Sequence, residues 1–190
     1  MSVPQLLVVG LGNLPFPLTR HSVGHLIVDS LASRLGVKLT SNKALAGHAA
    51  KGELFLGTGA VEVTLLKPKN LMNVSGPCVS QALQATRTPL SSLVVIHDSL
   101  SHTPATLSPK MGGSANGHNG VRSIIEALGG KKDFHRIRVG IGRGAEGKSV
   151  ADYVLGRLPS FEKQYWDWDG EGVDKVIQAL EQIVKKGAGK

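Results

Sequence analysis

The chain has 190 residues, of which 41% are apolar and 19% are charged, and its net charge is +8. This composition supports a packed core in one domain and excludes an intrinsically disordered chain. The excess of positive charge favours a polyanionic partner, and nucleic acid before a membrane surface.

Features that the sequence lacks exclude further classes of protein. No apolar run approaches the roughly 20 residues of a membrane-spanning helix. No positively charged leader precedes the first apolar segment, so no targeting segment is visible. The single cysteine, Cys78, cannot form an internal disulfide, and it falls within an apolar helical pattern that suits a core position. We therefore expect a protein that is neither membrane-bound nor secreted.

The first half of the chain predicts strands and helices in alternation. A short apolar run at 6–9, closed by a glycine, indicates a buried strand. Apolar residues four apart over 23–35 indicate a helix that ends at a glycine cap. Strands at 53–56 and 61–66 flank the turn sequence GTGA and form a hairpin. A proline at a typical helix start then opens a helix over 77–85.

The second half continues the alternation. Three further segments read as strands, at 93–96, at 105–107 (ending before Pro109) and at 136–141. A glycine-rich stretch leads into a helix at about 121–128, and a last amphipathic helix spans about 173–186, with a frayed tail at 187–190. Together these elements predict one α/β domain over 1–190, with a mixed, largely parallel twisted sheet and helices on both faces.

Polar side chains gather where the predicted strands end. In α/β sheets such loop positions carry the functional groups. The residues concerned are Asn13, Arg20, His21, Asn73, His97, Asp98, His118 and Asn119. Five loops thus bring together amides, imidazoles and one carboxylate.

These residue types suit the activation of water. A histidine can take the proton of a water molecule while a carboxylate fixes its tautomer and stabilises the resulting cation. Asparagine amides can hold a substrate and donate hydrogen bonds to a developing oxyanion. No serine stands in a G-x-S-x-G elbow, so direct attack by water is favoured over a covalent route.

Seven ordered blocks spread from residue 10 to residue 156: GLGN, TRHSVG, KPKNLMNVSG, VVIHDSL, KMGGSANGHNGVRSI, FHRIRVGIGR and YVLG. In this order they resemble the bacterial-type peptidyl-tRNA hydrolases. TRHSVG and the glycine-rich block are closest to the eukaryotic, often mitochondrial, branch of that family. The resemblance implies hydrolysis of the ester bond between a peptide and its tRNA. It also implies a monomer in the cytoplasm or the mitochondrial matrix, without cofactor or metal.

The resemblance implies a catalytic set of four residues. His21 matches the histidine that acts as general base, and Asp98 matches the acidic residue that orients it. Asn13 and Asn73 match the asparagines that hold the substrate and position the reacting ester.

Substrate-binding residues follow from the same resemblance. Asn119 matches the asparagine that binds the peptide backbone or a water molecule. Lys110 and Arg138 match the basic pair that grips the 5′-phosphate of the tRNA acceptor stem, next to the 3′ CCA end. Phe16 and Leu71, in two loops of the expected site, complete the set of candidates.

The chain departs from the common bacterial pattern at four places. The loop LPFPL after GLGN is shorter by two residues, and Ser22 follows His21 where asparagine is usual. Leu71 replaces an aromatic residue, and HDSLSH replaces HDELDLP after the third strand. We expect these changes to affect the rate and the peptide preference rather than the reaction.

Three alternatives accompany this interpretation. The first is a non-catalytic RNA-binding relative, for which the basic cluster near Arg136 and Arg138 would suffice. The second is a dinucleotide-dependent enzyme, although Pro15 occupies the place of the third glycine in the G-x-G-x-x-G motif. The third is a metal site at His97, Asp98 and His102, whose spacing fits no established ligand signature. We expect His97 and His118 to support the neighbouring residues or to be structural.

Overall fold

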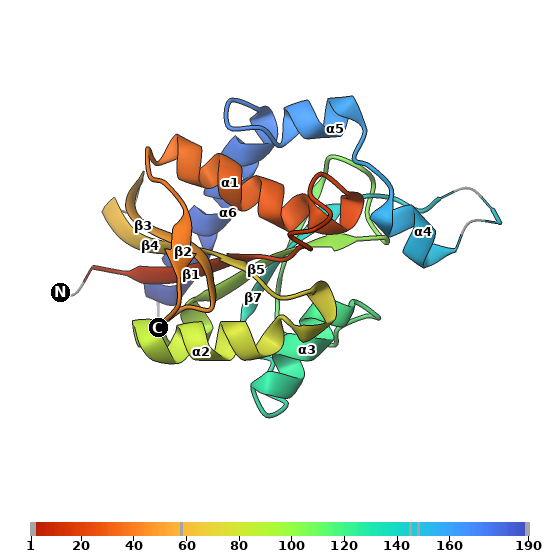
Figure 1. Ribbon diagram of the computed structural model, residues 1–190. Coiled ribbons are helices and arrows are strands. Elements are labelled where there is room, and N and C mark those ends of the chain that lie inside the picture. The colour runs from red at the N-terminus through yellow and green to blue at the C-terminus, as the bar shows by residue number, and fades with distance from the viewer. Residues whose placement is uncertain (1–2, 58, 145, 148, 189–190) are drawn as a thin grey trace.

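The computed structural model describes residues 3–57, 59–144, 146–147 and 149–188. A seven-stranded sheet runs through the molecule, with helices packed on both of its faces (Figure 1). Within the described ranges, no helix is both long and apolar enough to cross a lipid bilayer.

The sheet has a parallel centre and antiparallel edges. Its strand order is β2-β3-β4-β1-β5-β7-β6. The parallel strands are β4 (Gly59–Pro68), β1 (Gln5–Gly10), β5 (Leu93–Ser99) and β7 (His135–Gly140). The antiparallel strands are β2 (Thr40–Asn42) and β3 (Gly47–Leu56) at one edge and β6 (Leu107–Met111) at the other. The prediction of a mixed sheet is confirmed, with parallel pairing confined to the four central strands.

Two apolar layers separate the helices from the sheet. Residues at alternate positions of β1 point to opposite faces, so Leu6 and Val8 join one core cluster while Leu7 and Val9 join the other. The first cluster is covered by α1 (Val23–Arg34), α5 (Ser160–Tyr165) and α6 (Glu171–Ala188), and the second by α2 (Gly76–Thr86) and α3 (Asn119–Ala127). The predicted helices on both faces are therefore confirmed.

The loop after β1 and the start of α1 touch backbone to backbone. A Cβ added to Gly10 would overlap the carbonyl group of Gly24, and one added to Gly24 would come within 2.6 Å of the backbone nitrogen of Leu11. This close approach requires glycine on both sides. This contact holds the GLGN loop next to the chain segment that carries His21.

Several predicted bounds differ from the structure, among them the first strand of the hairpin, which begins at Gly47 rather than at residue 53. Two further corrections concern Pro109 and the C-terminal tail. The strand expected to end before Pro109 instead runs from Leu107 to Met111 with Pro109 inside it, opposite Ile137. An edge strand tolerates proline because only one of its sides is paired. The last helix continues to Ala188, so the prediction of a frayed tail is wrong for residues 187 and 188, while 189 and 190 lie outside the described residues.

Besides the 3-10 helices η1 (Arg20–Ser22), η2 (Met72–Val74) and η3 (Leu90–Ser92), one strand and two α-helices were not predicted. These are β2, α5 and the short helix α4 (Val150–Leu155). Each of the three spans only three to six residues, too few for a hydrophobic period to show.

Candidate active site

The site lies where β1, β4 and β5 end, at the edge where ligands bind in open α/β sheets. Asn13 follows β1, and His21 lies in the 3-10 helix η1 (Arg20–Ser22) just before α1. Asn73 lies in η2 (Met72–Val74), which follows β4, and Asp98 is the sixth residue of β5. Parallel pairing of these strands brings loops that are distant in sequence to one place.

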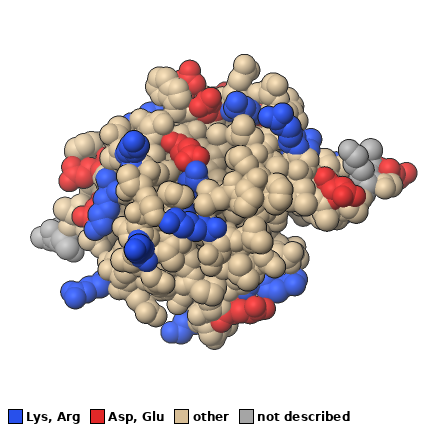
Figure 2. All heavy atoms as spheres, viewed as in Figure 1, with Lys and Arg blue, Asp and Glu red and all other residues tan. Residues whose placement is uncertain are grey.

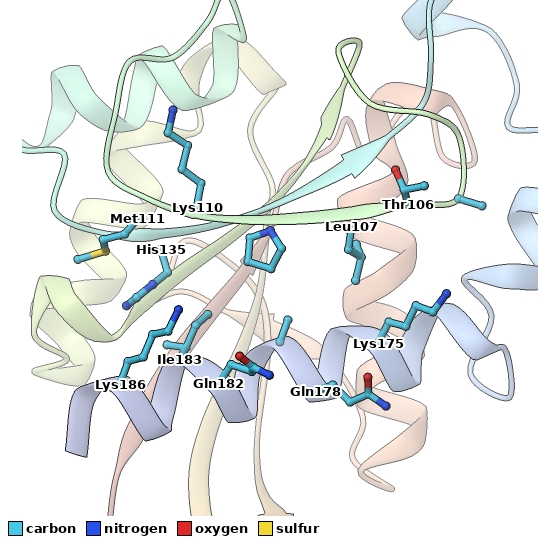
Figure 3. A pocket seen from close by; sticks show the side chains of 13 residues that line it. Thr106, Leu107, Lys110, Met111, His135, Lys175, Gln178, Gln182, Ile183 and Lys186 are labelled. Atoms are coloured by element: carbon cyan, nitrogen blue, oxygen red, sulfur yellow. The ribbon is translucent and has the colours of Figure 1, made fainter. Parts of the chain in front are cut away.

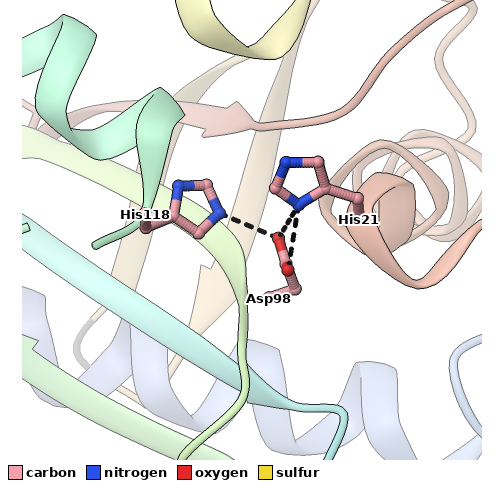
Figure 4. Close-up of side chains that lie close together, drawn as sticks. All are labelled: His21, Asp98 and His118. Atoms are coloured by element: carbon pink, nitrogen blue, oxygen red, sulfur yellow. Dashed lines mark hydrogen bonds and ion pairs between the residues drawn. The ribbon is translucent and has the colours of Figure 1, made fainter. Parts of the chain in front are cut away.

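Asp98 accepts hydrogen bonds from two histidines (Figure 4). Nδ1 of His21 lies 2.9 Å from Oδ1 and 3.0 Å from Oδ2 of Asp98. Nε2 of His118, which begins α3 as its N-cap, lies 2.8 Å from the same Oδ1. The carboxylate is 3% exposed, whereas the side chains of His21 and His118 are 14% and 9% exposed. The imidazoles therefore stand between the buried charge and the solvent.

The two histidines stabilise the charged form of Asp98. Burial alone would raise the pKa, but the electrostatic attraction and the hydrogen bonds of His118 and His21 hold it well below its ordinary value. Within the described ranges, no Lys or Arg forms an ion pair with this carboxylate. Asp98 is therefore an anion that only accepts hydrogen bonds.

The tautomers of both rings follow from these bonds. The backbone N–H of Val121 donates to Nδ1 of His118 over 3.2 Å, so that nitrogen is an acceptor and Nε2 carries the hydrogen that Asp98 receives. His21 likewise donates its Nδ1–H to the carboxylate. The remaining nitrogen of His21, Nε2, then has a free lone pair, as a general base requires.

Asn13 ties three loops of the site together. Its Oδ1 accepts the backbone N–H of Met72 over 2.7 Å, and its own backbone N–H donates to Oγ of Ser22 over 3.0 Å. Because the oxygen is engaged, the Nδ2 end is the one left to donate towards a substrate. Ser22 also donates to the carbonyl group of Phe16 over 2.9 Å, so the serine that departs from the family pattern holds the short LPFPL loop.

The other predicted substrate-binding residues near this centre are exposed. Asn73 follows Met72, and Asn119 follows His118 as the first residue of α3; both are exposed. Phe16 and Leu71 are 54% and 49% exposed, although both are large and apolar. These four side chains are accessible to a substrate that reaches the site, and no hydrogen bond joins any two of them.

The predicted basic pair lies on the paired strands β6 and β7. Arg138 donates from Nε to the carbonyl oxygen of Ser108 over 3.1 Å and from Nη2 to its Oγ over 2.6 Å. Lys110 stands opposite Arg136 in register, and its side chain points away from helix α6 (Figure 3). Both predicted cations therefore belong to the same sheet edge.

A third cation lies beneath this pair. Arg136 is 1% exposed, and its Nη2 donates to the carbonyl oxygen of Gly112 over 2.7 Å. Burial and the neighbouring charge of Arg138 lower its pKa. A Cβ added to Gly113 would lie 2.8 Å from Nζ of Lys110 and 3.3 Å from Nη2 of Arg136, so these two cations face one point.

Charged side chains of both signs share the face of the molecule that Figure 2 presents. Lys and Arg are interspersed there with Asp and Glu. The candidate anion site is therefore the group Lys110, Arg136 and Arg138 on β6 and β7, and the net charge does not by itself mark a site.

The metal cluster considered from the sequence does not form. Nδ1 of His97 donates to the backbone oxygen of Asp98 over 2.8 Å, and the ring of His102 is bonded to Oγ of Ser99 at 2.7 Å. Burial lowers the pKa of His97 well below its ordinary value, which keeps that ring neutral. Among the described residues, the trio whose donor atoms come together is His21, Asp98 and His118. His118 was expected to support its neighbours or to be structural, but local patterns could not predict that its partner is Asp98, 20 residues away at the end of β5.

Comparison with known proteins agrees over nearly the whole chain. A family model described as "Peptidyl-tRNA hydrolase" matches residues 7–190. The chain is 40% identical to a peptidyl-tRNA hydrolase of Geobacillus kaustophilus over 184 residues, which are 94% of this chain and 92% of that protein. It is 43% identical to one of Pseudomonas putida over 181 residues, 94% and 89% of the two chains. The crystal structure of peptidyl-tRNA hydrolase from Acinetobacter baumannii superposes with a TM-score of 0.82 at 29% identity, covering 100% of this chain and 93% of that one.

Proposed function

We propose that this chain, which belongs to the peptidyl-tRNA hydrolase family, hydrolyses the ester bond between a peptide and the 3′ ribose of tRNA. The products are a free peptide and a tRNA with an intact 3′-hydroxyl. One observation carries the proposal: His21 donates Nδ1–H to both oxygens of a buried Asp98 and so keeps Nε2 as a base. No cofactor or metal takes part in this reaction as we propose it.

His21 activates the water directly. Its Nε2 takes a proton from a water molecule as the water oxygen attacks the ester carbonyl carbon. The tetrahedral intermediate then collapses, the bond to the ribose oxygen breaks, and the proton passes from Nε2 to that oxygen. Asp98 stabilises the imidazolium that exists between these steps, and it does not itself take the proton.

His118 is the positioning residue of this arrangement. Its N-cap bond to Val121 fixes the ring so that Nε2–H points at Asp98. With that donor in place, a second histidine holds the carboxylate through Oδ1, the oxygen that His21 also contacts. The support expected from His118 is thus a hydrogen bond from its Nε2–H to Asp98.

The asparagines and apolar side chains bind the substrate around this centre. Nδ2 of Asn13 is suited to donate to the ester or its oxyanion, since its oxygen is held by Met72. Asn73 positions the same group from the neighbouring loop, and Asn119 binds the peptide backbone or a water molecule. Exposed Phe16 and Leu71 offer apolar surface to the peptide or the terminal base.

Lys110 and Arg138 grip the 5′-phosphate of the acceptor stem. Charge-assisted bonds from ammonium and guanidinium groups favour phosphate, and such contacts fix position without reading sequence. The buried charge of Arg136 adds to the positive potential at this edge. Recognition through a phosphate group suits an enzyme that acts on many different tRNAs.

A non-catalytic RNA-binding role is the second candidate. The net charge of +8 and the three cations at the β6–β7 edge favour it as far as RNA binding is concerned. A protein that only binds RNA, however, does not need a buried carboxylate such as Asp98 hydrogen-bonded to the imidazole of His21. We therefore favour the hydrolase.

Turnover of a blocked substrate tests the proposal. With diacetyl-lysyl-tRNA, we expect the wild type to release the blocked amino acid and His21→Ala to be slower by about 10²–10⁴, the usual contribution of a positioned base. His135→Gln is the matched control, because His135 lies on β7 away from the catalytic group, and it should keep wild-type turnover. A wild type that binds the substrate without hydrolysing it would favour the RNA-binding role.

The same proposal includes a monomer in the cytoplasm or the mitochondrial matrix. All the residues named above come from one chain, which supports activity without a second copy. Light scattering on the active fraction tests the monomer, and detection of the tagged protein in separated cell fractions tests the compartment.

A further inference from the structure

Three metal-ligating atoms converge at the base of the site. One ring nitrogen of His21, one carboxylate oxygen of Asp98 and one ring nitrogen of His118 all lie within 4.8 Å of one another. The nitrogens that face Asp98 are Nδ1 of His21 and Nε2 of His118. The two rings are inclined at 44°, with centroids 5.2 Å apart. These atoms come from η1, β5 and the N-cap of α3, so the backbone of three separate elements holds them.

The three ligand atoms can surround one ion after rotations of their side chains. Zinc binds imidazole nitrogen and carboxylate oxygen at about 2.0–2.2 Å, so ligands in a tetrahedron lie roughly 3.3 Å apart. Oδ1 of Asp98 now lies 2.9 Å from His21 and 2.8 Å from His118. The two ring nitrogens, which lie within 4.8 Å of each other, must also reach a similar separation. A rotation of the carboxylate that lengthens both of its separations by a few tenths of an ångström, together with rotations of the two rings, would let the three atoms face one ion.

The donor set selects the kind of metal. Two imidazoles and one carboxylate form the ligand set of many zinc sites, in which water takes the fourth position. Magnesium and calcium prefer oxygen ligands, and magnesium keeps most of its water. The carboxylate of Asp98 forms no ion pair with Lys or Arg in the described part of the chain, so its charge is available to a cation.

We propose that His21, Asp98 and His118 bind one Zn²⁺ ion and that the bound ion inhibits the enzyme. The inhibition rests on the function proposed above, whereas the binding does not. Zinc is an inhibitor here and takes no part in hydrolysis.

Inhibition follows from the ring nitrogens that carry the hydrogens of His21 and His118 once the metal is bound. A metal on Nδ1 of His21 moves its hydrogen to Nε2, and a metal on Nε2 of His118 moves that hydrogen to Nδ1. Both rings stay neutral, so no proton leaves the protein in these two shifts. His21 can then no longer accept a proton from water, because its only free nitrogen already carries one.

The same shift has a structural consequence at α3. Nδ1 of His118 now accepts the backbone N–H of Val121, and it would become a donor when the metal binds. The N-cap bond is therefore lost on binding. We expect the affinity for zinc to be lower than at a site whose ligands have no other partners.

A binding measurement without substrate tests the site. Titration calorimetry of the full chain with Zn²⁺, and visible absorption with Co²⁺ as a spectroscopic substitute, report the stoichiometry and the ligand geometry. His118→Asn removes the third ligand, yet asparagine is a favoured N-cap residue and can still receive the N–H of Val121. His135→Gln is the control for adventitious binding to a histidine outside the trio.

We expect one zinc ion per chain in the wild type and in His135→Gln, and binding at least tenfold weaker in His118→Asn. Mg²⁺ at the same concentrations should not compete. Equal zinc affinity in the wild type and His118→Asn, with both folded by circular dichroism, would overturn the proposal. The Asp98→Asn variant gives a second reading, since it removes the ligand charge without changing either histidine.

Turnover is measured separately on the same proteins. Hydrolysis by the wild type should fall as the site fills with zinc and return when a chelator removes it. Zinc that binds at the trio without slowing hydrolysis would refute the inhibitory role. Absence of any turnover, with zinc binding intact, would instead count against the proposed function alone.

Discussion

Replacing Asp98 by asparagine tests the hydrogen bonds between Asp98 and the two histidines, and it hardly changes the shape of the side chain. In the wild type, Oδ1 accepts from His118 over 2.8 Å and from His21 over 2.9 Å, while Oδ2 lies 3.0 Å from the same nitrogen of His21. An amide offers one oxygen and one NH₂ group in these two places. The N-cap fixes His118 as a donor, so the amide oxygen must take the place of Oδ1.

The NH₂ group then stands 3.0 Å from Nδ1 of His21, where Oδ2 was. If that nitrogen keeps its hydrogen, two donors face each other. If the ring changes tautomer, Nε2 becomes protonated and the base is lost. The imidazolium of the transition state also loses its charge-assisted hydrogen bond, in which one N–H is shared between the two carboxylate oxygens. At about 1.5–3 kcal/mol for a hydrogen bond to a charged group, this loss alone is worth about 10–10² in rate, and the change of tautomer adds to it.

Single-turnover release of diacetyl-lysine from its tRNA measures this loss without interference from product release. We expect Asp98→Asn to bind tRNA with wild-type affinity, since the phosphate contacts lie on β6 and β7. Nitrogen-15 chemical shifts of the His21 ring report the tautomer independently. A folded Asp98→Asn protein whose single-turnover rate stays within tenfold of wild type would refute the reasoning.

Three further predictions concern binding and stability. Lys110→Ala and Arg138→Ala should each weaken tRNA binding and lower the slope of log K against log salt by about one; unchanged slopes in filter binding would remove both from the phosphate contact. Asn13→Ala leaves the buried N–H of Met72 without its acceptor and should lower the free energy of unfolding by about 1–3 kcal/mol in urea titrations. Burial lowers the pKa of His25 to about 3 from 6.5, so the unfolded chain binds the proton more strongly and stability is lost as the pH falls below 6.5. The contribution of His25 should reach about 2 kcal/mol at pH 5, so His25→Phe should lose about that much less stability than the wild type between neutral pH and pH 5; equal acid sensitivity of the two proteins would contradict it.

Most of the regular structure could be predicted from local patterns. The strand at Gln5–Gly10 and the helix at Val23–Arg34 carry periods that match one buried face, so their sequences specify them without reference to the rest of the chain. The strand through Pro109 was misjudged for the opposite reason. Whether a proline can remain in a strand depends on which side is paired, and only the sheet order decides that.

The sequence by itself determined the alternation of strands and helices, the excess of positive charge and the polar residues at the strand ends, because each of these is a property of short segments. It also carried the family resemblance, and with it the expectation that His21 and Asp98 act together.

Only the tertiary structure decided how those residues meet. His21 and Asp98 are 77 positions apart, and the shared bond of His118 to the same oxygen depends on where α3 begins relative to the end of β5. The burial of Arg136 beneath Lys110 likewise follows from the pairing of β6 with β7. A sequence pattern reports the period within one element, whereas contacts between loops are set by the order and direction of the strands that carry them.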